Sequence, residues 1–155
     1  MSNLIINGDF ANKELAPWTS TSPGEPVFDS AGQSGAYSLL VEPNSQISQQ
    51  IRDTGTAEFR PSVKFSARIK SPASLAGSIA VVLSARDGFD SHFDVEVFTG
   101  LKGEWQTFEY KSKHLFPAVH EGFYVQLINA RTFENGGEAN APILVSGIEV
   151  LAGQP

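Results

Sequence analysis

Apolar and polar residues alternate along much of this chain. In the segment 62–70, the apolar side chains of Val63, Phe65, Ala67 and Ile69 are separated by serine, lysine and arginine. Successive side chains of a β-strand point to opposite sides of the sheet, so this alternation predicts a strand with one buried face. Hardly any stretch shows the spacing of three to four residues that is typical of an amphipathic helix. The pattern therefore predicts an all-β protein.

The same alternation predicts strands elsewhere in the chain. In two further strands the residues predicted to be buried are Phe93, Val95, Val97, Phe123, Val125 and Leu127. Additional strands are predicted at 4–6, 37–42, 46–51, 78–85, 105–110 and 143–151. Spacings of about 8–12 residues between turn signals are typical of a sandwich or barrel of short antiparallel strands.

Three turn signals separate the predicted strands. Pro43-Asn44-Ser45 fits a tight hairpin, Ser71-Pro72 ends a strand, and Arg86-Asp87-Gly88 offers a glycine that tolerates a positive φ. The chain has 155 residues, 41% of them hydrophobic, with no internal repeat and no linker. We therefore expect one domain over residues 1–155 with a core of its own.

Charge and composition exclude several classes of function. The 11 Lys and Arg residues against 17 Asp and Glu give a net charge of −6, so no nucleic-acid partner is expected. No segment approaches the roughly 18 apolar residues of a transmembrane helix, so no membrane insertion is expected. The absence of cysteine excludes disulfides and thiolate zinc sites. The N-terminal residues lack a signal-peptide pattern, which favours a cytoplasmic location or release by a non-classical route.

Candidate catalytic patterns are weak. The sequence contains no nucleophile elbow, no phosphate-binding loop and no zinc-binding histidine pair. Asp94 and Glu96 lie two residues apart on a predicted strand, so both point to the same face of the sheet. A glycosidase needs two such carboxyl groups, one on each side of the glycosidic bond that it cleaves. Such a pair on a small domain without deep loops is more typical of a solvated sheet face. We therefore predict that the protein is not an enzyme.

Four landmarks resemble a known family. They are the segment 3–10 (NLIINGDF) followed by Trp18, the segments 35–41 and 47–51, the segment 103–106 (GEWQ), and a final strand at 143–151. Their order resembles that of carbohydrate-binding modules of the family 4, 9 and 22 type, in which the second landmark forms a pair of strands. The resemblance implies a jelly-roll β-sandwich of two antiparallel sheets, of the galactose-binding-like class, with a glycan as ligand.

Individual residues of these landmarks have expected structural roles. Asn7-Gly8 is expected to form a turn with a positive φ that returns Phe10 to the sandwich. Trp18 and Trp105 are expected to pack in the core or at its rim rather than to bind sugar. Because Gln49-Gln50 are neighbours on a predicted strand, one of the two must face the core or an edge.

The resemblance also bears on metal binding. Family members often hold a structural calcium near the first turn and the last strand. Here Ala11 and the segment 145–148 (VSGI) stand where two carboxylate ligands are expected, which leaves Asp9 as the candidate metal ligand. Calcium takes 6–8 oxygens, several of them from carboxylates, so no cofactor is expected; the alternative is a structural calcium held by Asp9 and backbone carbonyls.

Polar residues off the predicted core form a candidate binding surface. Sugars are bound by aromatic rings that stack on C–H groups and by planar polar side chains that pair with hydroxyls. If the strands share a sheet, as the jelly-roll order suggests, one cleft is lined by Arg68, Ser84, Arg86, Asp94, Glu96, Tyr124 and Gln126. The alternative is an ordinary solvated sheet face with arginine–carboxylate pairs.

A second candidate surface is a rim of loops. The segments 87–91, 114–117 and 131–135 each hold a phenylalanine among polar residues, which either reaches solvent or plugs an end of the sandwich. The sequence thus predicts a non-catalytic, lectin-like module that binds a glycan in a sheet-face cleft or on the loop rim. The alternative is a structural or protein-interaction module of a phage tail, toxin or secretion-associated assembly, with a protein partner or as a homo-oligomer.

Overall fold

The computed structural model describes residues 3–31, 35–70, 77–87, 90–118, 122–129 and 141–153. Within these ranges the regular elements are all β-strands, as the alternation predicts. The strands are β1 (Thr19–Ser20), β2 (Phe28–Ser30), β3 (Tyr37–Val41), β4 (Ser45–Ile51), β5 (Arg60–Ile69), β6 (Gly77–Asp87), β7 (Asp90–Leu101), β8 (Gln106–Lys111), β9 (Phe123–Asn129) and β10 (Ile143–Gly153). The described residues include no helix long and apolar enough to cross a membrane.

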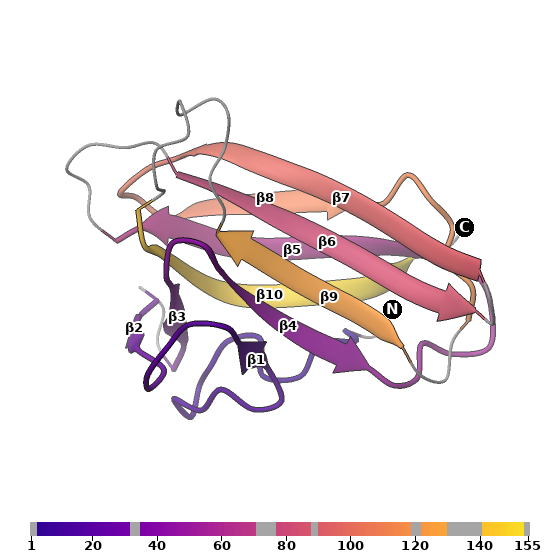
Figure 1. Ribbon diagram of the computed structural model, residues 1–155, viewed down its shortest axis with the longest axis horizontal. Coiled ribbons are helices and arrows are strands. Elements are labelled where there is room, and N and C mark those ends of the chain that lie inside the picture. The colour runs from indigo at the N-terminus through magenta and orange to yellow at the C-terminus, as the bar shows by residue number, and fades with distance from the viewer. Residues whose placement is uncertain are drawn as a thin grey trace.

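The strands form two stacked antiparallel sheets of five strands each. The first, called the β9 sheet here, has the order β1-β4-β9-β6-β7, and the second, the β10 sheet, has the order β2-β3-β10-β5-β8. Figure 1 shows β4, β9, β6 and β7 side by side across the front, with β10, β5 and β8 behind them. This architecture confirms the predicted jelly-roll β-sandwich.

The core lies between the two sheets and is built from alternate residues of the central strands. All four apolar residues of the 62–70 pattern are buried on β5, and Phe123, Val125 and Leu127 are buried on β9, as predicted. Phe123 also packs edge-on against Phe116, with ring centroids 5.5 Å apart. Full burial of such side chains stabilises the fold by about 1.5–3 kcal/mol each, so the core alone accounts for two closely packed layers.

The prediction for the parity of β7 is wrong. Phe93, Val95 and Val97 are exposed to 61%, 39% and 49%, whereas Asp94 is only 8% exposed. The register explains the difference, because Ser84 pairs with Phe93, so that the apolar residues of β7 share the outer side of β6. At this edge of the sandwich the inner side of β7 meets polar groups of β8 and the following turn, which supply hydrogen bonds to Asp94.

The strand predicted at 4–6 is also absent. The N–H of Leu4 donates to the carbonyl of Val150 (2.8 Å), and Asn3 forms an isolated bridge with Leu151. The buried side-chain amide of Gln49 bonds both the N–H and the carbonyl of Ile6, each at 2.9 Å. The Gln49 side chain thus supplies the hydrogen bonds that the backbone of Ile6 would otherwise make with a neighbouring strand. Of the two adjacent glutamines, Gln49 faces inward and Gln50 is exposed, as predicted.

The first landmark is a structural turn, as expected. The positive φ falls on Asn7 (59°), and Phe10 returns to a fully buried position beside Trp18. The indole N–H of Trp18 donates to the carbonyl of Asn7 (2.9 Å). Gly8 serves a different purpose, because a Cβ at this position would lie 2.0 Å from the carbonyl oxygen of Ile148. The turn is therefore held directly against β10.

Pro43-Asn44-Ser45 does not form the predicted hairpin. Asn44 has a φ of 62°, and its N–H donates to the carbonyl of Asn129 (2.6 Å). The segment 42–44 connects β3 in the β10 sheet to β4 in the β9 sheet, where Ser45 pairs with Asn129. The segments 35–41 and 47–51 are consequently not a hydrogen-bonded pair. By contrast, β6 and β7 do form a hairpin, closed by Asp87 and Asp90.

Candidate functional site

The outer side of the β9 sheet brings polar, aromatic and apolar side chains into ordered rows. One row runs Gln50–Tyr124–Ser84–Phe93 across four neighbouring strands. The next row runs Ser48–Gln126–Val82–Val95, with Thr19 of β1 beside Ser48. Directly opposed residues of antiparallel strands project from the same face, so these side chains form one continuous surface. We call it the Tyr124 face.

Tyr124 stands between two hollows of this face. Its side chain is 41% exposed, and it lines both hollows, which have volumes of about 310 and 290 Å³. The first hollow, toward β7, is lined by Ser84, Ala85, Arg86, Ser91, His92, Phe93, Gly122 and Tyr124. The second, toward β1, is lined by Pro17, Thr19, Ser48, Gln50, Arg52 and Tyr124. An aromatic ring flanked by hydroxyl, amide and guanidinium groups can stack on a sugar and hydrogen-bond to its substituents.

Four of the predicted ligand residues meet on this face. Ser84 and Arg86 come from β6, and Tyr124 and Gln126 come from β9, which pairs with β6. Four residues that were not among the predicted ligand residues join them: Thr19, Gln50, Arg52 and Phe93. Gln50 was visible as half of a glutamine pair, whereas the place of Arg52 depends on the register of β4, which the sequence does not specify.

Arg68 does not belong to this site. Its strand, β5, pairs with β10 and β8 in the other sheet, so the assumption that all these strands share a sheet is wrong. The Arg68 guanidinium lies over the Trp105 ring, with its central carbon 5.2 Å from the ring centroid. Trp105 is half-buried, which agrees with rim packing. Its ring face is already covered by a cation, which leaves less of it for a sugar.

Asp94 and Glu96 point away from the Tyr124 face, contrary to the prediction. Asp94 Oδ2 accepts hydrogen bonds from Tyr110 Oη, Ser112 Oγ (2.6 Å) and the N–H of Lys113 (3.2 Å). Burial raises the pKa of Asp94, but the hydrogen bonds from Ser112, Tyr110 and Lys113 lower it by more, so the net pKa lies below its usual value. This carboxylate joins β7 to the end of β8 and stays ionised, which suits a structural tie rather than a general acid.

The surroundings of Asp9 do not fit a calcium ion. Asp9 Oδ1 accepts the N–H of Ala11 (3.2 Å), and its carbonyl accepts the N–H of Tyr37 (2.9 Å). The carbonyl of Gly8 accepts the N–H of Ile148 (3.0 Å). In the described part of the chain, no three His, Cys, Asp or Glu residues gather as metal ligands. The oxygens near this turn therefore already bond the backbone, and the carboxylates that a hard cation needs are missing there.

The predicted loop rim is only partly within the described residues. Phe116 is fully buried and packs against Phe59 and Phe123, so this phenylalanine plugs the end of the sandwich. Phe89 and Phe133 lie outside the described residues. Within the described part of this rim, Phe116 thus contributes to core packing.

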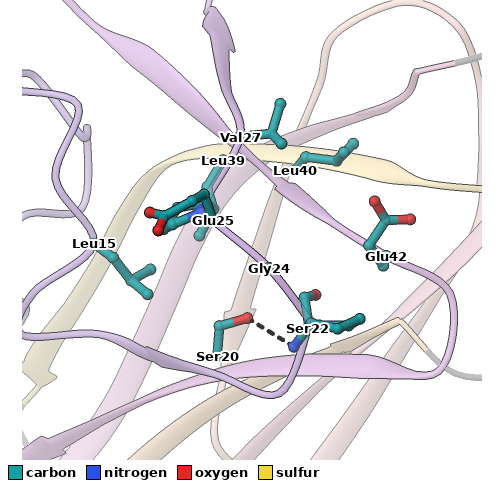
Figure 2. A pocket seen from close by; sticks show the side chains of 11 residues that line it. Leu15, Ser20, Ser22, Gly24, Glu25, Val27, Leu39, Leu40 and Glu42 are labelled. Carbon is teal, nitrogen blue, oxygen red and sulfur yellow. Dashed lines mark hydrogen bonds between the residues drawn. The ribbon is translucent and has the colours of Figure 1, made fainter.

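Two other hollows are less suited to a sugar. One of them is a pocket of about 150 Å³ whose described lining residues include Glu25 and Glu42 but no aromatic ring (Figure 2). A larger hollow of about 440 Å³ lies on the β10 sheet, and the Lys64–Glu109 ion pair (3.7 Å) lines it. Neither hollow combines an exposed ring with free amide and hydroxyl groups, so the Tyr124 face is the candidate site.

The two stacked sheets and the aromatic and polar outer face of one of them place this chain among β-sandwich domains of the jelly-roll type. A protein-family model described as "Carbohydrate binding domain" (CBM_4_9) matches residues 2–113, well over half of the chain. The chain therefore belongs to this family of carbohydrate-binding domains. The matched range ends before β9, so the family model does not cover Tyr124. A search of the curated proteins finds no match.

Solved structures show the same fold at low sequence identity. The tandem CBM22-1-CBM22-2 domain of Paenibacillus barcinonensis Xyn10C aligns with a TM-score of 0.67 and 15% identity, over 95% of this chain and 48% of that one. The C-terminal family 22 carbohydrate binding module of Clostridium thermocellum Xyn10B aligns at 0.63 and 16%, over 96% and 98%. The arabinose-bound α-L-arabinofuranosidase MgGH51 aligns at 0.59 and 13%, but this chain spans only 26% of its length.

Proposed function

We propose that this domain binds a glycan on the Tyr124 face without altering it chemically. The observation that carries the proposal is the position of Tyr124, an exposed ring with a hollow on each side. Gln50 and Ser84 flank it in the same row and offer an amide and a hydroxyl to sugar hydroxyls. The membership in a carbohydrate-binding family supports the ligand class, and the geometry supports the face.

The same face supports a binding role rather than a hydrolytic one. A glycosidase places two carboxyl groups about 5–10 Å apart on either side of the scissile bond. In the part of the chain that the structure describes, no Asp or Glu lines either hollow, and Asp94 and Glu96 are on the other side of β7. The proposal therefore predicts no turnover on a broad panel of glycosides, and hydrolysis of any member would contradict it.

Xylan is the first ligand to test, because a similar solved structure is described as a xylan-binding domain from family 22. Affinity electrophoresis through gels containing xylan or other polysaccharides measures retention, and titration calorimetry measures the dissociation constant. We expect the Tyr124→Ala variant to bind about tenfold more weakly, because loss of the ring removes a stacking contact of about 1–2 kcal/mol. Tyr124→Phe keeps the ring and should keep most of the affinity.

Trp105→Ala provides a matched control on the opposite side of the sandwich, since it removes an aromatic ring from the outer side of the β10 sheet. We expect it to bind like the parent chain. If Trp105→Ala abolishes binding while Tyr124→Ala does not, the glycan lies on the β10 sheet and the proposed site is wrong.

A further inference from the structure

Two arginines border Tyr124, one in each hollow. Arg86 lines the hollow toward β7, and Arg52 lines the hollow toward β1. Ile51 of β4 and Ala85 of β6 both pair with Phe123 of β9. Arg52 directly follows Ile51, Arg86 directly follows Ala85, and Gly122 directly precedes Phe123, so the arginines flank the glycine at this end of the three strands. Two strand spacings separate their backbones, which is about 10 Å. The arginines thus stand on either side of one point of the face.

The ring of Tyr124 covers Gly122, which lies between the two arginines. A Cβ added to Gly122 would lie 4.0 Å from Cε2 of Tyr124, so the ring leans over the glycine, which has no side chain of its own. The aromatic surface is consequently flanked by one guanidinium in each direction across the sheet. A sugar stacked on the ring would have its substituents within the hollows that the arginines line.

Neither arginine is engaged by an acidic partner in the described residues. The ion pairs found there are Lys64–Glu109 and Lys70–Asp29, both away from this face. The carboxylate next to Arg52 in sequence, Asp53, accepts the N–H of Gly55 (2.9 Å). Among the described residues, no Asp or Glu lines either hollow, although acidic residues outnumber basic ones in the chain, 17 to 11. The face is therefore a locally cationic surface on an acidic protein, and the charges are available to a ligand.

We infer that the ligand is a carboxylate-bearing glycan, a polysaccharide with uronic acid residues, whose carboxylates pair with Arg52 and Arg86 while a sugar ring stacks on Tyr124. This inference rests on the proposed function and adds the chemical class of the sugar. The planar guanidinium matches a carboxylate with two parallel hydrogen bonds, and such charge-assisted pairs are stronger than bonds to neutral hydroxyls. The net charge of −6 repels a polyanion elsewhere, which confines binding to this face.

The test compares acidic polysaccharides with their own neutral derivatives. Glucuronoxylan and polygalacturonate are each used as such and after reduction of their carboxyl groups to primary alcohols, which preserves the backbone. We expect at least one acidic form to bind about tenfold more tightly than its reduced form, with an advantage that declines as salt is raised. Equal affinity for the acidic and reduced forms of every ligand overturns the inference but leaves the proposed function standing. Binding to none of the four, nor to any neutral glycan, overturns the proposed function itself.

Variants locate the charge effect. Arg52→Gln and Arg86→Gln should each weaken binding of the acidic form about tenfold and leave binding of the reduced form unchanged. Arg68→Gln, on the outer side of the other sheet, is the matched control and should bind the acidic form like the parent chain. Arg86→Lys keeps the charge but loses the planar fork, so it should restore only part of the affinity.

Thermal unfolding of each variant checks that the fold is intact, as expected for the exposed Arg52 and Arg86 and for the half-buried Arg68. Loss of acidic-form binding in Arg68→Gln alone would overturn the assignment. Equal binding of a sulfated, carboxylate-free polysaccharide would likewise overturn the carboxylate requirement, because it would show that any anion suffices.

Discussion

The hydrogen bonds to Asp94 predict how much this carboxylate contributes to the free energy of unfolding. In the Asp94→Asn variant the acceptor keeps its shape but loses its charge. Three donors point at Asp94 Oδ2, from Tyr110, Ser112 and the backbone of Lys113. A hydrogen bond to a charged group contributes about 1.5–3 kcal/mol, against about 0.5–1.5 kcal/mol for a neutral one. A difference of about 1 kcal/mol for each donor predicts a loss of about 3 kcal/mol.

Urea unfolding followed by tryptophan fluorescence measures this loss, with buried Trp18 as a reporter. With a slope of about 2 kcal/mol per molar urea, the midpoint should fall by about 1.5 M. Glu109→Gln is the matched control, because it makes the same chemical change in a carboxylate that is mostly exposed and paired with Lys64. An exposed ion pair contributes less than about 1 kcal/mol, so the control should lose little.

The loss should depend on pH in one direction. The pKa of Asp94 in the folded protein lies below its unfolded value of about 3.9, so its contribution is fully present above that value. The contribution disappears as the pH falls through the folded pKa. The difference between the parent chain and Asp94→Asn should therefore be constant from about pH 5 to 8 and shrink below about pH 4. A difference no larger than that of Glu109→Gln, or one that persists undiminished at low pH, would refute the reasoning.

Gly8→Ala should cost about 3 kcal/mol or more, or prevent folding, because its Cβ would overlap the carbonyl of Ile148, whereas Gly100→Ala, with open space but a φ of 73°, should cost only about 1 kcal/mol in the same urea assay. Gln49→Leu should lose about 1–3 kcal/mol, since it leaves the N–H and carbonyl of Ile6 without their partner, and Gln50→Leu should lose little. Burial, together with the hydrogen bond to Asp94 and the negative charge of Asp94, raises the pKa of Tyr110 to about 12. Absorbance should therefore show one tyrosine that ionises near pH 12, and its pKa should shift toward 10 in Asp94→Asn. The stability that this hydrogen bond contributes is complete below about pH 10 and is lost as the pH rises through 12. Chelation with EDTA should leave the melting temperature unchanged, and a fall of many degrees would show that the turn at Asp9 binds a metal after all.

The fold could be predicted from the sequence because alternation reports directly on a sheet with one buried face. The prediction of buried residues failed on β7. This strand has two alternating sets of side chains, one on each face, and the pattern alone does not tell which set faces the core. There the apolar set of Phe93, Val95 and Val97 is outside, because the inner side meets the hydroxyls of Tyr110 and Ser112. The two-residue strand β1 and the three-residue strand β2 are too short to show any alternation at all.

The site could be predicted only as far as neighbouring strands could be inferred. Ser84 and Tyr124 share a face because β6 pairs with β9, and both were named from their parity. Arg68 was grouped with them wrongly, because membership of a sheet is decided by crossovers such as the one at Asn44, which local sequence does not reveal. Arg52 follows a strand whose register is fixed only by its pairing with β9.

The central claim is that the ligand lies on the outer side of the β9 sheet. Amide chemical-shift mapping during titration with an acidic xylo-oligosaccharide tests it most directly. The account predicts that the largest shifts fall on Gln50, Ser84, Tyr124 and Gln126, and that Lys64, Ser66, Thr107 and Glu149 on the outer side of the β10 sheet remain unmoved. Shifts concentrated on this second group, with none on the first, would contradict it.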